Sequence, residues 1–224
     1  MTAVTFYRST IGKKVVMALS GLILVGFVFL HMVGNLKVYE GAAKINAYGH
    51  FLREVGSPVF GHSQLLWIVR LVLLASVGLH IAAAAQLTLA DRASRPTGYR
   101  RRGSVQASYA SRTMRWGGVI VLLFIIYHLL HFTTGTVHPD FREGEVYHNM
   151  VSGFQVWYVS AFYILAMVAL GLHLQHGIWS LFQTLGLNNG RYNRLLKLVA
   201  VGIALLIVLG NISIPIAVLA GVVK

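Results

Sequence analysis

Four histidines lie one apiece in four of the five long apolar segments of this 224-residue chain. They are His31, His80, His128 and His173, at successive spacings of 49, 48 and 45 residues. An imidazole in the bilayer interior is costly unless something binds it, so an evenly distributed set of four indicates a function. Two histidines on facing helices can supply both axial positions of a haem iron. We therefore expect these residues to bind haem.

The composition is typical of an integral membrane protein. Hydrophobic residues make up 56% of the chain and charged residues only 11%, outside the usual range of soluble proteins. About 20 apolar helical residues cross the roughly 30 Å of bilayer hydrocarbon, and runs without alternating polarity favour helices over barrel strands. We predict an all-α polytopic protein with one domain, residues 1–224, in which four helices form a haem-binding bundle and a fifth, without histidine, packs peripherally. The five predicted helices cover approximately residues 12–36, 63–91, 112–136, 153–185 and 193–223.

The distribution of charge predicts the orientation. Thirteen of the 19 basic residues fall at the N-terminus and in the second and fourth loops, whereas five of the six acidic residues fall on the other side. The positive-inside rule then predicts a multi-pass protein of the cytoplasmic membrane, with its N-terminus in the cytoplasm and its C-terminus outside. This orientation signal and attraction to anionic lipid explain the net charge of +13, so we expect no nucleic-acid partner. The first apolar run, 20 residues long, exceeds a typical signal-peptide core, and we expect it to be retained.

Residue counts along the predicted helices sort the four histidines into two depths. At 1.5 Å rise per residue, His31 and His128 lie roughly 6 and 10 Å below the outer boundary. His80 and His173 lie roughly 24 and 30 Å below it. The counts therefore predict an outer pair and an inner pair.

Other histidines leave alternatives open. His131 follows His128 by three residues and His176 follows His173 by three, so each shares a helix face with its neighbour and spacing alone does not choose the ligand. We prefer His128 and His173, because the other two lie nearer to the end of an apolar run, where a propionate hydrogen bond or an interfacial role is plausible. Four further histidines are expected to be solvated in the outer loops: His50, His62, His138 and His148.

Several kinds of chemistry are excluded by the sequence. The chain has no cysteine, which removes iron–sulfur ligation, thiolate catalysis, disulfides and covalent haem attachment. It also lacks a Walker loop, a dinucleotide-binding fingerprint and a zinc-protease helix motif. Any chemistry hosted by the chain must therefore depend mainly on histidine and a bound cofactor.

Nearly the whole chain carries short motifs of one known family. The His-x-x-x-Gly-x-Trp-Ser element that begins at His173 is the most specific of them. The others are Gly12-Lys13-Lys14, Leu19-Ser20-Gly21, His31-Met32-Val33-Gly34-Asn35-Leu36, Gly78-Leu79-His80, Arg112-Thr113-Met114-Arg115-Trp116-Gly117-Gly118 and Tyr127-His128. With these motifs the chain resembles the cytochrome b membrane subunit of the succinate dehydrogenase and fumarate reductase family, specifically the single-chain, five-helix, dihaem cytochrome b558 type.

The resemblance implies two haem b groups. It matches His80 with His173 at the inner haem and His31 with His128 at the outer haem, and so decides against His131 and His176. It also implies two water-soluble partners, a flavoprotein subunit with FAD and an iron–sulfur subunit on the inner face. Electrons would pass between that subunit and a membrane quinone, which we expect to be menaquinone. Succinate chemistry itself would occur on the partners.

Further residues are candidates for propionate and quinone binding. Three residues lie near the predicted inner boundary: Ser20, Arg112 and Arg115. They could contact haem propionates or the partner subunit, and ordinary interfacial anchoring explains the arginines equally well. Family members that use menaquinone are thought to need a carboxylate near the outer haem, and Glu54 is the nearest by position. Arg70 is a charge inside an apolar segment, which indicates a function unless the side chain extends to the interface.

Two other classes of protein remain as alternatives. A dihaem cytochrome b of a hydrogenase or formate dehydrogenase also stacks two haems, although the motifs above favour the first family. A proton-coupled transporter with histidine relays is the third hypothesis, and it predicts a colourless protein.

Overall fold

The computed structural model describes residues 2–94 and 109–224, without the side chains of residues 3, 4 and 109–112. All regular elements in these ranges are helices and no strand occurs there, which confirms the all-α class. Five helices are long and apolar enough to cross a membrane: α2 (Thr10–Asn35), α4 (Gln64–Ala93), α5 (Tyr109–Phe132), α7 (Trp157–Thr184) and α8 (Asn193–Leu219). The short elements are α1 (Ala3–Arg8), the 3-10 helix η1 (Leu36–Glu40), α3 (Ala42–Glu54) and α6 (Val146–Gln155).

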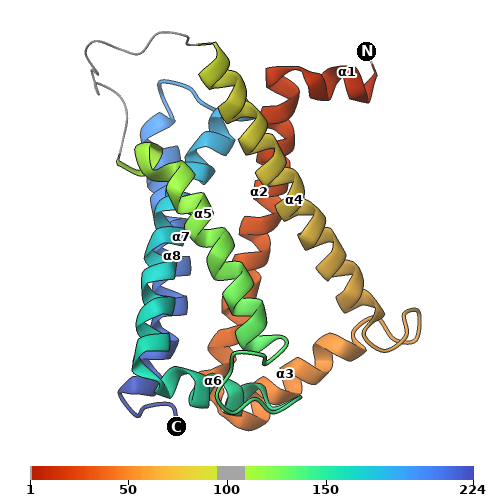
Figure 1. Ribbon diagram of the computed structural model, residues 1–224, viewed down its shortest axis with the longest axis vertical. Coiled ribbons are helices and arrows are strands. Elements are labelled where there is room, and N and C mark those ends of the chain that lie inside the picture. The colour runs from red at the N-terminus through yellow and green to blue at the C-terminus, as the bar shows by residue number, and fades with distance from the viewer. Residues whose placement is uncertain (1, 95–108) are drawn as a thin grey trace.

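The long helices run along the longest axis of the molecule (Figure 1). The N-terminus and α1 lie at one end, called the N-terminal end below, and the C-terminus, α3 and α6 lie at the other, called the C-terminal end. Helix α7 packs against α8, α5 and α2, while α2 also packs against α4. Towards the C-terminal end α2 and α4 diverge, and α3 runs between their ends (Figure 1).

The interface between α7 and α8 forms much of the buried core. Ala200 and Ala204 are buried on α8, and such small residues let membrane helices approach closely. Gly171 on α7 has the same effect, since a Cβ added there would lie 2.6 Å from the Val208 side chain. This close packing fixes α7, the helix that carries His173.

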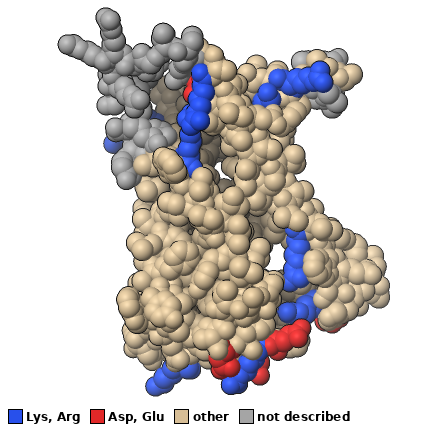
Figure 2. Space-filling model, viewed as in Figure 1, with Lys and Arg blue, Asp and Glu red and all other residues tan. Residues whose placement is uncertain are grey.

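Most of the remaining surface of the long helices is apolar. On α4 alone, Leu71 and Leu74 are 60% and 69% exposed. Figure 2 shows a mostly uncharged middle, with acidic side chains gathered mainly at the lower, C-terminal end. An apolar belt between charged ends is the surface expected of a protein that spans a bilayer.

The predicted helix over residues 153–185 is divided in the structure. Helix α6 ends at Gln155, Val156 is extended, and α7 begins at Trp157. The hydroxyl of Ser160 donates a hydrogen bond to the carbonyl oxygen of Phe154 at 2.6 Å, which holds the corner. Helices α3 and α6 together cover the C-terminal end of the bundle, a feature that the search for long apolar runs does not reveal.

Candidate functional site

The first candidate site lies between His80 of α4 and His173 of α7. Their ring centroids are 6.3 Å apart, with 62° between the ring planes. Nδ1 of His80 lies 3.0 Å from the carbonyl oxygen of Met17, to which it donates a hydrogen bond. A protonated Nδ1 leaves Nε2 as the free lone pair of a neutral imidazole, which is the form that binds a metal.

The space beside these two rings depends on glycines. A Cβ added at Gly21 would lie 3.2 Å from Cε1 of His80, and one at Gly118 would lie 3.6 Å from Cε1 of His173. A cavity of about 190 Å³ beside His173 is lined by Met114, Ala169 and other residues of α5 and α7. Nδ1 of His173 is buried and has the backbone of Met114 as its polar neighbour. The site therefore combines open space with two imidazoles, as a haem site requires.

The second candidate site lies between His31 of α2 and His128 of α5. Their ring centroids are 5.8 Å apart and the ring planes are nearly perpendicular, at 89°. The ring of Phe27 stacks on His31 with 5.3 Å between centroids. Phe124 and Phe132 each lie 5.8 Å from the His128 ring. Aromatic side chains, rather than glycines, therefore surround this pair.

A polar cluster extends from His128 towards the C-terminal end. The hydroxyl of Tyr163, on α7, lies 3.4 Å from Nδ1 of His128 and 3.1 Å from Nδ1 of His131. The His131 ring is fully buried and stacks on His138 with 4.7 Å between centroids. Nε2 of His138 in turn lies 2.8 Å from the carbonyl oxygen of Asn149, to which it donates.

Sequence reasoning missed part of this cluster. His138 was expected to be a solvated loop residue, and that expectation is wrong, because its ring is half-buried against His131 and Phe141. Tyr163 was not predicted at all, since one tyrosine in an apolar helix carries no distinctive spacing. The only signal available was that His131 needs a polar partner if it is buried.

The separation of the two rings in each pair can be compared with that of two axial imidazoles on one metal ion. Two imidazoles whose nitrogens each lie about 2 Å from one metal ion hold their ring centroids about 6 Å apart. Both observed separations lie close to that value. The structure also pairs the histidines as the depth counts do. His131 is engaged by Tyr163 and His138 instead, and His176 is half-buried one turn from His173.

The candidate propionate residues lie at the N-terminal end. Ser20 is buried beside His80, with its hydroxyl 3.4 Å from Nδ1 of that ring, and it donates to the carbonyl oxygen of Val16 at 2.7 Å. Arg115 forms an ion pair of 3.2 Å with Asp91, which links α5 to α4. The side chain of Arg112 lies outside the described residues.

The candidate quinone residues, Glu54 and Arg70, make their side-chain contacts with residues other than the four paired histidines. The Glu54 carboxylate is 61% exposed and accepts a hydrogen bond from Nδ1 of His62. The guanidinium of Arg70 lies 4.9 Å from the ring centre of Trp67, near the start of α4. Glu54 is the last residue of α3 and Arg70 lies in the second turn of α4. The two helices come together towards the C-terminal end, where α2 and α4 diverge (Figure 1).

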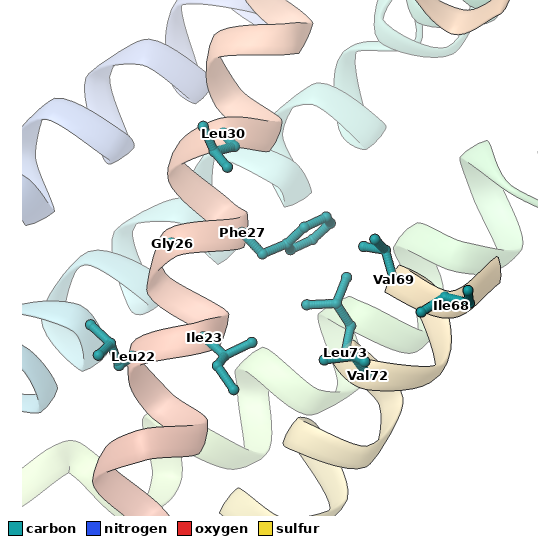
Figure 3. A pocket seen from close by; sticks show the side chains of 9 residues that line it. All are labelled: Leu22, Ile23, Gly26, Phe27, Leu30, Ile68, Val69, Val72 and Leu73. Carbon is teal, nitrogen blue, oxygen red and sulfur yellow. The ribbon is translucent and has the colours of Figure 1, made fainter. Parts of the chain in front are cut away.

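An apolar groove of about 380 Å³ opens between α2 and α4 (Figure 3). Leu22, Ile23 and Phe27 line it from α2, while Val69 and Leu73 face them from α4. Phe27 is also the ring that stacks on His31. The groove therefore connects the lipid-facing surface to the surroundings of one candidate ligand.

The fold and the site define a polytopic helical membrane protein with two half-buried histidine pairs. A family model for the succinate dehydrogenase/fumarate reductase transmembrane subunit matches residues 92–209, more than half of the chain. The chain belongs to that family. Curated proteins and solved structures give no match.

Membership of the family establishes the general role. The chain is a membrane subunit of a succinate dehydrogenase/fumarate reductase complex, so its enzymatic role belongs to the complex. This result favours that assignment over the hydrogenase, formate dehydrogenase and transporter alternatives. The matched range includes His128 and His173, whereas His31 and His80 lie before it.

Proposed function

We propose that this chain is the dihaem cytochrome b anchor of its complex and passes electrons between an iron–sulfur subunit and menaquinone. The observation that carries the proposal is the presence of two histidine pairs on four helices, each with ring centroids about 6 Å apart. Bound haem b would supply reversible one-electron chemistry at each pair. The protein would supply axial nitrogens, burial and the hydrogen bonds that tune them.

In this proposal His80 and His173 hold the inner haem and His31 and His128 hold the outer haem. The N-terminal end faces the cytoplasm, because basic residues dominate there and acidic residues gather at the other end (Figure 2). Moving one charge across the full membrane potential changes its free energy by about 2.3 kcal/mol per 100 mV. Two sites at different depths therefore allow electron transfer to be coupled to the membrane voltage.

The soluble partners would bind at the N-terminal end. A basic surface there suits a water-soluble iron–sulfur subunit, which in turn would bind a flavoprotein subunit with FAD. Arg115 is already paired with Asp91, so its first role is to hold α5 against α4. Propionate contacts of Ser20 and Arg112 remain part of the proposal, with Ser20 placed next to His80 by its 3.4 Å contact.

Quinone would bind near the outer haem, at the C-terminal end. Quinone reduction consumes protons, and the hydrogen-bonded Glu54 and His62 can hold and transfer a proton at the surface. The groove between α2 and α4 suits the hydrocarbon tail, since apolar side chains line it. Arg70 and Trp67 lie on α4 near the same end and would contribute to the entrance.

Haem content tests the proposal directly. The complex, purified from cells supplied with a haem precursor, should contain two haems per chain in a pyridine haemochromogen assay. His173→Ala and His31→Ala should each reduce the content to one, while the matched control His176→Ala should retain two. A wild-type complex without Soret absorption would rule the proposal out.

The quinone site needs a separate experiment. Glu54→Gln should abolish quinone-linked succinate turnover while both haem spectra remain intact. The reason is that an amide side chain, unlike a carboxylate, does not take up and release a proton. Glu40→Gln is the matched control, since Glu40 is an acidic residue of the same end that pairs with Lys37 instead. Normal turnover in Glu54→Gln would remove Glu54 from the site.

A further inference from the structure

The His31–His128 pair has a side-chain partner that the metal-ligand pattern does not explain. The Tyr163 hydroxyl lies between two imidazole nitrogens, 3.4 Å from Nδ1 of His128 and 3.1 Å from Nδ1 of His131. A phenol hydroxyl can accept one hydrogen bond while it donates another. One atom of α7 therefore joins two histidines of α5.

One arrangement of the protons gives both hydrogen bonds of this bridge a donor and an acceptor. An imidazole that binds iron through Nε2 carries its proton on Nδ1, so His128 would donate to the Tyr163 oxygen. Tyr163 would then donate to Nδ1 of His131, which leaves the remaining His131 proton on Nε2. That Nε2 atom is buried and has no hydrogen-bond partner in the described part of the chain. Each bridging hydrogen bond thus has one donor and one acceptor.

The packing around the bridge holds it in place. Tyr163 is 6% exposed, and the rings of Phe124 and Phe154 meet it edge-on with centroids 5.1 and 5.0 Å away. Behind His131, a Cβ added at Gly153 would lie only 2.9 Å from Cε1 of the imidazole. Close packing therefore surrounds both the phenol and the imidazole.

We propose that Tyr163 is a positioning residue that orients the His128 imidazole and, with His131 behind it, sets the redox potential of the haem bound there. The inference rests on the proposed function, since it requires a haem at the His31–His128 pair. Hydrogen-bond acceptance from Nδ1–H raises the basicity of an axial imidazole and favours ferric iron, which lowers the potential. The proposal also assigns His131 a role, as the acceptor that orients the Tyr163 hydroxyl.

Tyr163→Phe tests the proposal, because it removes one oxygen and keeps the ring. The potential of the outer haem should rise, with a ferric-to-ferrous ratio up to about tenfold lower at fixed potential, equivalent to about 59 mV for one electron. Its affinity for haem should fall about tenfold or more, as for other outer-shell partners of metal ligands. The inner haem should keep its potential.

The measurement is a redox titration of the purified complex, followed by visible absorption. The outer step is the one absent from His31→Ala. Tyr127→Phe is the matched control. The Tyr127 ring belongs to the same aromatic cluster and stacks on His131 with 5.5 Å between centroids, but the bridging hydroxyl is that of Tyr163. A second variant, His131→Leu, should raise the outer potential in the same direction, because the Tyr163 hydroxyl loses its acceptor.

The outcomes separate this inference from the proposed function. Two haems in the wild-type complex, with an outer potential raised in Tyr163→Phe and unchanged in Tyr127→Phe, would support it. Two haems with the same outer potential in wild type and Tyr163→Phe, or an equal rise in both tyrosine variants, would overturn it while leaving the dihaem function intact. A wild-type complex without haem would instead refute the proposed function.

Discussion

Nδ1 of His80 donates to a main-chain oxygen, that of Met17 at 3.0 Å, whereas Nδ1 of His128 faces a side chain, the hydroxyl of Tyr163 at 3.4 Å. A main-chain partner persists through almost any substitution at its own position, because every residue supplies the same carbonyl. A hydroxyl is lost by a single substitution. The two sites therefore differ in how easily mutation can change them.

The packing around the two histidine pairs also differs. Glycines Gly21 and Gly118 make room beside His80 and His173, while aromatic rings such as Phe27 pack beside His31. We therefore expect haem binding to respond to added volume at the first site and to lost contacts or altered ring chemistry at the second. The site at the N-terminal end is thus defined by main chain and space, and the one at the C-terminal end by side chains.

Added volume beside His80 should give the largest effect. In Gly21→Val the new Cβ would lie 3.2 Å from Cε1 of His80, and its methyl groups would occupy space next to the ring. We expect haem content to fall from two to one per chain in a haemochromogen assay. Gly26→Val is the control on the same helix, because a Cβ there meets nothing within 4 Å. Two haems in Gly21→Val would show that the glycine does not shape this site.

Added volume at the other end should act on stability instead. In Gly153→Ala the new Cβ would lie 2.9 Å from both Cε1 of His131 and Nε2 of His138, and overpacking of this kind costs about 1–3 kcal/mol. Unfolding in mixed detergent micelles should show that loss. Gly78→Ala, where a Cβ meets nothing within 4 Å, should leave stability equal or up to about 1 kcal/mol higher. Equal stability of the two variants would mean that the His131 cluster is not tightly packed.

Removal of the aromatic ring that stacks on His31 should have a smaller effect. Aromatic pairs contribute about 0.5–1.5 kcal/mol, so Phe27→Leu should release the outer haem about 2–10 times faster to excess apomyoglobin. The inner haem should be released at the wild-type rate. Phe29→Leu provides the matched control, since Phe29 and Phe27 are 37% and 38% exposed but it is Phe27 that stacks on His31. Faster release of the inner haem would contradict the separation of the two sites.

The sequence predicts the parts of this architecture that repeat an apolar pattern. Length and hydropathy identify the five long helices, and residue counts along them place His80 with His173 and His31 with His128. Helices α3 and α6 escape that approach, because their faces pack on the bundle end while neither is long enough to span a membrane.

The hydrogen-bond partners of the paired histidines could not be predicted from the sequence. Met17 acts through its main chain, so its side-chain identity carries no information about the hydrogen bond to His80. Tyr163 meets His128 across 35 residues of sequence, and only the packing of α7 on α5 brings them together. His138 comes from a loop that folds back on His131, a path that neither composition nor periodicity specifies.

The smallest effect is expected from Ser20→Ala. Its hydroxyl is 3.4 Å from Nδ1 of His80 but donates to the Val16 carbonyl at 2.7 Å, so the better acceptor for His80 is the Met17 carbonyl at 3.0 Å. That main-chain hydrogen bond survives the substitution, and the potential of the inner haem should stay at its wild-type value in a redox titration. A shift as large as that expected for Tyr163→Phe would mean that a side-chain hydroxyl tunes both sites, and the contrast between main-chain and side-chain control would no longer hold.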